Sequence, residues 1–69
     1  MLSGMEFRAD LYAAGGLYRD RARFYARHEE EAVEAARQLV VAHGLDHALL
    51  FVSDSPSQAR LIAKVGAER

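Results

Sequence analysis

Residues 5–27 decide the fold, and they read MEFRADLYA, AGG and LYRDRARFYAR. On both sides of the glycine pair, apolar side chains alternate with polar ones, which is the two-residue period of a half-buried strand. Gly15 and Gly16 supply the positive φ values that a tight turn between antiparallel strands requires. The stretch therefore predicts a β-hairpin whose apolar face is formed by Met5, Phe7, Ala9, Leu11, Ala22, Phe24 and Ala26.

Two loop lengths fit this hairpin, and they differ in cross-strand pairing. A two-residue loop sets Phe7 opposite Phe24 and leaves one unfavourable pair, Arg8 against Arg23, because like charges directly opposed destabilise a sheet. A four-residue loop keeps the same faces but puts Arg8 against Arg21 instead. Both registers stay open on the sequence alone.

A helix is predicted after the hairpin. Three glutamates, residues 29–31, favour the positive end of a helix dipole, and His28 before them is expected to cap the helix. Gly44 suits the left-handed conformation that ends a helix, with Leu45 covering Val40. The buried stripe at helical spacing is expected to contain Ala32, Val33, Ala36, Leu39, Val40 and His43.

Two more elements are predicted beyond this helix. Residues 47–53, HALLFVS, predict a third strand that is apolar on both faces. In the next segment Ser55 fits a helix N-cap, Pro56 the first helical position, and Gln58 the far member of a capping box. A short second helix is therefore expected, ended by Gly66 and packed inward through Ala59, Leu61, Ile62 and Val65.

The expected fold class is α+β in the order ββαβα, a three-stranded mixed sheet with two helices on one face. Because the first helix carries the chain back across the sheet, the third strand is expected to run parallel to the second. The third strand is also expected at a sheet edge. Residues 1–69 are expected to form a single small α/β domain, with residues 1–4 a frayed extension.

Composition narrows the class of protein. The 69 residues contain no cysteine, which excludes disulfides and thiolate metal sites, and the net charge of −1 gives no global attraction for nucleic acid or anionic lipid. The longest apolar run, residues 48–52, is too short to span a bilayer. A start without the pattern of a signal peptide predicts a cytoplasmic location, and the many alanines and arginines favour a bacterial origin.

The sheet face that the helices would leave uncovered is the best functional lead. In a chain this small, the free energy gained by burying apolar side chains is about equal to the conformational entropy cost of folding. A partner chain is therefore expected to add the missing stability. Aromatic and apolar side chains beside arginines resemble the centre of a protein interface. We therefore expect a non-enzymatic module that forms a homodimer or higher homo-oligomer through its third strand and this face, anchored by Tyr12, Tyr25, Leu49 and Phe51.

The same face supports an alternative of another class, a single-stranded nucleic-acid-binding domain. Aromatic rings on an open sheet stack bases, and arginines contact phosphates. Asp10 and Glu6 lie among those arginines and weaken the attraction, and no RNP-type string is present. The arginines that would bind phosphate are Arg8, Arg19, Arg21 and Arg23.

Catalytic and metal sites have weak candidates only. His43 and His47 flank Asp46, but the turn at Gly44 keeps the two histidines off a common helical face, so no metal is expected. The serines of residues 53–57 could bind an anion at the predicted second helix, although a well-capped helix start explains them better. No cofactor and no catalytic residue are predicted.

Overall fold

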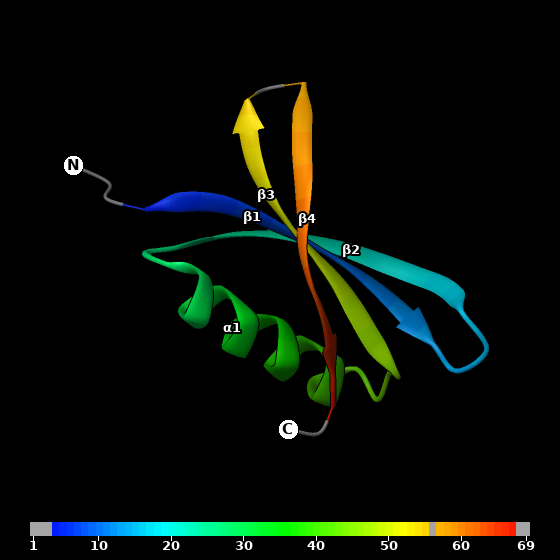
Figure 1. Cartoon of the computed structure of the whole chain (residues 1–69). Helices are drawn as coiled ribbons and strands as arrows, with labels where there is room; N and C mark the ends of the chain where they lie inside the picture. The colour runs from blue at the N-terminus through cyan, green and yellow to red at the C-terminus, as the bar shows by residue number, and fades with distance from the viewer. Residues whose placement is uncertain (1–3, 56, 68–69) are drawn as a thin grey trace.

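A computed structural model, which describes residues 4–55 and 57–67, contains one helix and four strands (Figure 1). In chain order these are β1 (Met5–Ala13), β2 (Leu17–Ala26), α1 (Glu29–Ala42), β3 (His47–Ser55) and β4 (Gln58–Gly66). All neighbouring strands pair antiparallel, in the order β2-β1-β3-β4. The strands cross in Figure 1 because the sheet is strongly twisted, and α1 lies along one of its faces.

The hairpin follows the register predicted for the shorter loop over most of its length. Phe7 pairs with Phe24 and Arg8 with Arg23, which eliminates the four-residue loop. Near the turn the register shifts by one residue, so that Tyr12 faces Tyr18 and Arg19 becomes the extra residue of a bulge. The loop is thereby residues 14–16, closed by a hydrogen bond from the Gly16 amide to the Ala13 carbonyl at 3.1 Å.

The helix begins and ends as its sequence predicts. His28 is the N-cap, with extended backbone, and its Nδ1 accepts a hydrogen bond from the Glu31 amide at 3.4 Å. At the other end Gly44 has φ +65°, and the amides of Gly44 and Leu45 donate to the carbonyls of Val41 and Val40. These two bonds form a Schellman motif, which satisfies carbonyls that the last helical turn leaves free.

The predicted second helix is wrong, because residues 58–66 form β4 instead. The register of β4 against β3 shifts between Leu61 and Ala63, which leaves Ile62 as an extra, bulged residue. The bulge interrupts the two-residue alternation, and the apolar positions of the segment then acquire a spacing that fits a helix equally well. Ser55 pairs with Gln58 across the hairpin and caps no helix; Pro56 lies outside the described residues.

The predicted three-stranded mixed sheet is wrong as well, since the sheet has four strands and is antiparallel throughout. β2 and β3 do run in the same direction, but only because each pairs antiparallel with β1, which lies between them. β3 is therefore an inner strand, contrary to the edge position expected for it. As an inner strand, β3 pairs its backbone with β1 on one edge and with β4 on the other, so it leaves no free edge over residues 47–52.

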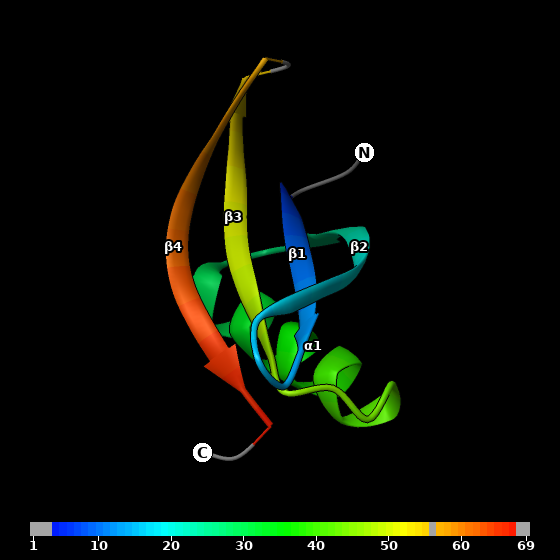
Figure 2. The ribbon, with the colours of Figure 1, turned by 90° about the vertical axis from the view of Figure 1, so that its right-hand side faces the viewer.

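The core lies between α1 and the covered face of the sheet (Figure 2). Phe7 packs there with its ring 6.0 Å from that of Phe24, centroid to centroid. Alanines at the contact bring the helix and the sheet close together. The fully buried apolar residues include Phe7, Ala9, Leu11, Ala32, Ala36, Val40, Ala48 and Leu50. Within residues 4–55 and 57–67, no helix has the length and apolar character needed to cross a membrane.

Candidate binding face

The sheet surface opposite α1 brings together most of the residues that the sequence proposed for binding. We call it the open face. It follows from the strand register, since directly paired residues point to the same side of a sheet. Its members are Glu6, Arg8, Asp10 and Tyr12 of β1, Tyr18, Arg21, Arg23 and Tyr25 of β2, His47, Leu49 and Phe51 of β3, and Leu61 and Lys64 of β4.

Three of these members were not predicted from the sequence. Tyr18 takes the place on the open face that was expected for Arg19, because the bulge in β2 moves Arg19 out of the pairing. Leu61 and Lys64 pair with Phe51 and Leu49, but they belong to the segment expected to be helical. Aromatic pairing of Tyr18 with Tyr12 is the signal that a search for matched cross-strand residues could have used.

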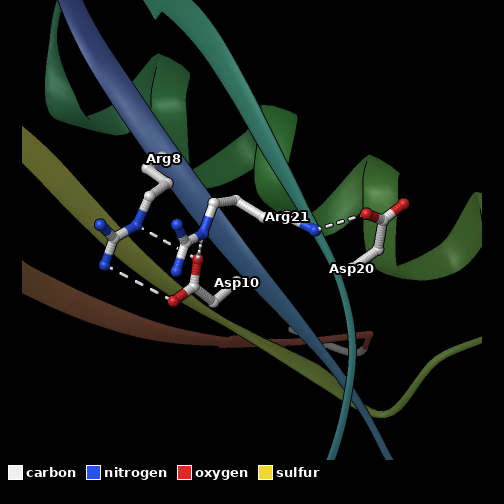
Figure 3. A network of polar contacts seen from close by, with 4 residues as sticks. All are labelled: Arg8, Asp10, Asp20 and Arg21. Atoms are coloured by element: carbon white, nitrogen blue, oxygen red, sulfur yellow. Dashed lines mark hydrogen bonds and ion pairs between the residues drawn. The ribbon is translucent and has the colours of Figure 1, made fainter.

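An ionic network crosses the centre of the open face (Figure 3). Asp10 is 6% exposed, and the side chains of Arg8 and Arg21 both point to it. Arg21 Nε donates to Asp10 Oδ1 at 3.0 Å, and Arg8 Nη2 donates to Oδ2 at 3.5 Å. Arg8 Nε lies 3.2 Å from Oδ1 without the geometry of a hydrogen bond, so this contact is a charge interaction only.

Arg8 avoids Arg23, the residue directly opposite, by reaching toward β3. Its guanidinium carbon lies 4.2 Å from the ring centroid of Phe51, within the range of a cation–π contact. The ion pair with Asp10 holds it on the same side. Arg8 and Arg23 are therefore paired in the register, as the sequence predicts for the shorter loop. The repulsion between them is reduced because the Arg8 side chain points toward β3 and away from Arg23.

The aromatic rings of the open face fall into two groups. The Tyr12 ring stacks on the His47 ring, with centroids 5.1 Å apart and an interplanar angle of 5°, and Phe51 is covered by Arg8. Tyr18 and Tyr25 remain accessible, with 52% and 63% of their surface exposed. Leu49 and Phe51 are half-buried. The most accessible rings thus lie on β2, at either end of the run that contains Arg21 and Arg23.

Charge is divided between the two sides of the molecule. The open face carries four cations, Arg8, Arg21, Arg23 and Lys64, against Glu6 and Asp10, a net charge of +2 among its members named above. Helix α1 carries four glutamates against one arginine, a net charge of −3. A nearly neutral chain is thereby basic on its sheet side and acidic on its helix side.

Two hollows adjoin β2. A polar one of about 170 Å³ is lined by residues that include Arg8, Arg23, Ser53, Ser57 and Gln58. A wider, mainly apolar groove of about 530 Å³ lies between β2 and α1. The first lies on the side of the open face, where Arg8 and Arg23 line it, and the second lies between the end strand β2 and α1.

The remaining sequence candidates do not assemble into a site. The serines of residues 53–57 lie in and beside the β3–β4 connection, where no helix begins among the described residues, so neither the expected helix cap nor an anion site at a helix start is present there. His43 is the C-cap of α1, while His47 lies on the open face with Nδ1 2.8 Å from Asp46 Oδ2. Among the residues that the structure describes, no group of three or more His, Asp or Glu could hold a metal ion.

Comparison of the chain with protein-family models, with curated proteins and with solved structures gives no match.

Proposed function

We propose that the protein is a non-catalytic binding module whose open face holds single-stranded nucleic acid. The observation that carries the proposal is the division of charge, which gives the uncovered sheet a net charge of +2 while α1 has −3. A basic surface beside accessible aromatic rings is the combination with which open sheets bind single strands. An acidic opposite side would orient a polyanion toward the sheet.

Strand β2 would supply most of the contacts. Tyr18 and Tyr25 stand near its two ends, opposite Tyr12 and Glu6 of β1, which are six positions or about 20 Å apart along that strand. Each ring offers an accessible surface for a base to stack on. Arg21 and Arg23 lie between them on the same side, where they would contact the phosphates that join the stacked bases.

The carboxylate of Asp10 takes little away from this surface. Asp10 is buried between Arg8 and Arg21, so its charge is already compensated within the sheet. No ion pair within 4 Å engages Arg23 or Lys64 in residues 4–55 and 57–67, so both are available for phosphate. The attraction would come chiefly from these two cations and from the outer guanidinium nitrogens of Arg21.

A homodimer through the same face is the second candidate. Leu49 and Phe51 are half-buried on β3, and Leu61 beside Phe51 is 55% exposed, which gives a small apolar patch. Two open faces of net charge +2 would repel each other, however, and Arg8 already covers Phe51. Pairing through the edge of β3 is no longer available, because β4 occupies that edge. These points favour an anionic partner over a second copy.

The test is a titration of a fluorescein-labelled 12-nucleotide oligo-dT by anisotropy, at 50 and 200 mM salt. We expect binding that weakens with salt, since phosphate contacts release counterions. Tyr18→Ala should lower the affinity roughly 5- to 150-fold, the loss of one stacked base. Val41→Ala, an exposed change on α1, is the matched control and should leave it unchanged. Absence of binding, or binding insensitive to salt, contradicts the proposal.

Sedimentation of the free protein separates the two candidates. We expect a monomer at micromolar concentration. A dimer that Leu61→Glu dissociates would instead support self-association through the open face.

A further inference from the structure

The outer edge of β2 is the most accessible backbone of the sheet. β2 is an end strand in the order β2-β1-β3-β4, so one side of it pairs with β1 and the other side pairs with no strand in residues 4–55 and 57–67. Nearly every residue of β2 from Leu17 to Tyr25 is exposed or half-exposed. Such an edge offers unpaired N–H and C=O groups to an added strand.

An apolar groove runs beneath this edge. It has a volume of about 530 Å³ and separates β2 from α1. Residues 22–25 of β2 form its sheet side, and Ala35, Gln38, Leu39 and Ala42 form its helix side. An edge strand beside a helix with an apolar groove between them is the arrangement in which peptides are bound by strand addition, because the backbone pairs with the edge and alternate side chains enter the groove.

We infer that β2 accepts an extended acidic peptide as a fifth strand of the sheet. Alternate apolar side chains of the peptide enter the groove between β2 and α1. The side chains between them point to the opposite side, where carboxylates meet Arg21 and Arg23.

Charge selects this occupant over a second copy of the chain. Residues 17–27 carry Arg19, Arg21, Arg23 and Arg27 against Asp20 alone, a net charge of +3. Two β2 edges paired antiparallel would bring arginines against arginines, and like charges directly opposed destabilise a sheet. An acidic strand has the complementary charge along its whole length.

The length of the groove fixes the peptide pattern. Ala35 and Ala42 are seven residues apart on α1, which is about 10 Å along a helix. Alternate side chains of a strand are about 6.6 Å apart, so the groove has room for two of them. The expected pattern is therefore five residues in the order acidic, apolar, acidic, apolar, acidic.

The experiment uses the full chain and a fluorescein-labelled peptide, Gly-Ser-Glu-Val-Glu-Val-Glu-Ser-Gly, followed by anisotropy. We expect saturable binding, and none for the same peptide with lysine in place of glutamate. Ala35→Glu places a carboxylate in the groove and should weaken binding at least tenfold. Val41→Glu is the matched control, because Val41 is exposed on the same helix and does not line the groove.

Amide hydrogen exchange of the unaltered protein provides a second readout that does not depend on a variant folding. Peptide binding should slow exchange at amides of β2 and leave those of β4, the other edge, unchanged. Equal loss of binding in Ala35→Glu and Val41→Glu, or protection at β4 in place of β2, would overturn the inference. So would a dimer in solution whose interface the peptide does not displace.

These results are distinguishable from those for nucleic acid. Ala35 belongs to α1 and is not a member of the open face, although Arg23 and Tyr25 of that face also line the groove, so Ala35→Glu should weaken oligo-dT binding much less than peptide binding. Tyr18 does not line the groove, so Tyr18→Ala should bind the peptide normally.

Discussion

Arg21 donates a hydrogen bond from Nε to Oδ1 of Asp10, 3.0 Å away on the neighbouring strand, and Asp10 is the buried charged residue of the described chain. Arg8 approaches the same carboxylate from its other side. The Arg21–Asp10 pair supports the register of β1 against β2 on the polar side, as Phe7 and Phe24 do on the apolar side, and Arg8 of β1 holds the same carboxylate in place.

Removal of the Asp10 carboxylate should destabilise the protein more than removal of the Glu34 carboxylate, although the ion pair of Glu34 with Arg37 at the surface has the shorter distance. Asp10→Ala removes the acceptor of Arg21 Nε and Arg8 Nη2 and the negative charge beside the buried Arg8 Nε, and we expect a loss of about 1–3 kcal/mol in the free energy of unfolding. Glu34 lies 2.6 Å from Arg37 but is exposed, so Glu34→Ala should cost less than about 1 kcal/mol. Urea unfolding of both variants measures the difference, and equal losses would contradict it.

Leu50 and Leu61 offer the same substitution on opposite faces of the sheet. Leu50 is fully buried under α1, so Leu50→Ala should cost about 2–5 kcal/mol, the transfer of the lost methyl groups plus a cavity. Leu61 lies on the open face, and Leu61→Ala should change stability by about 0.5 kcal/mol or less. Thermal unfolding followed by circular dichroism compares them. A large loss at Leu61 would mean that the open face is covered in solution.

Gly44 has a positive φ with open space around it, so the cost of a side chain there is purely conformational. Gly44→Ala should lower the free energy of unfolding by about 1 kcal/mol, because an L-residue pays for the left-handed conformation. Gly44→Asn should recover part of that loss, since asparagine tolerates this region. Denaturant unfolding of the two variants checks the order, and a neutral Gly44→Ala would argue against the Schellman end of α1.

Ala59 tests directly whether residues 58–66 form a strand. It is exposed on β4 and pairs with Ser53. Threonine has a higher strand propensity than alanine and pairs well with a cross-strand serine, so Ala59→Thr should be stabilising by up to about 1 kcal/mol. In a helix the same change would be destabilising by about 0.5 kcal/mol. The sign of the change in unfolding free energy therefore decides between the two structures.

Arg23 should act on nucleic-acid binding as a phosphate contact without base preference. Arg23→Ala should weaken oligo-dT and oligo-dA binding by similar factors and reduce the slope of log K against log salt by about 0.7, the value for one phosphate of a single strand. Anisotropy titrations at three or more salt concentrations give the slope. Glu30→Ala on α1 is the control, and we expect it to leave the slope unchanged.

Most of the open face was predictable because it depends on local alternation. Strand period and the glycine turn place Arg8, Arg21 and Tyr25 on one side without knowledge of the rest of the fold. The two-residue alternation of residues 47–53 likewise placed Leu49 and Phe51 on the same face. Arg19 was wrongly included because the bulge takes it out of the pairing and puts Tyr18 opposite Tyr12, and alternation alone does not locate a bulge.

The sequence by itself determined the hairpin, the ends of α1 and the apolar character of β3, since each is encoded by neighbouring residues: alternation, a capping histidine, a glycine at positive φ. Only the tertiary structure decided that residues 58–66 form a strand and that β3 lies inside an antiparallel sheet. The local helix-start pattern at Ser55 offered a few capping bonds, whereas pairing with β3 satisfies a whole edge of backbone groups and buries Val65 in the core. That gain exists only once β3 is in place, so no window of sequence reveals it.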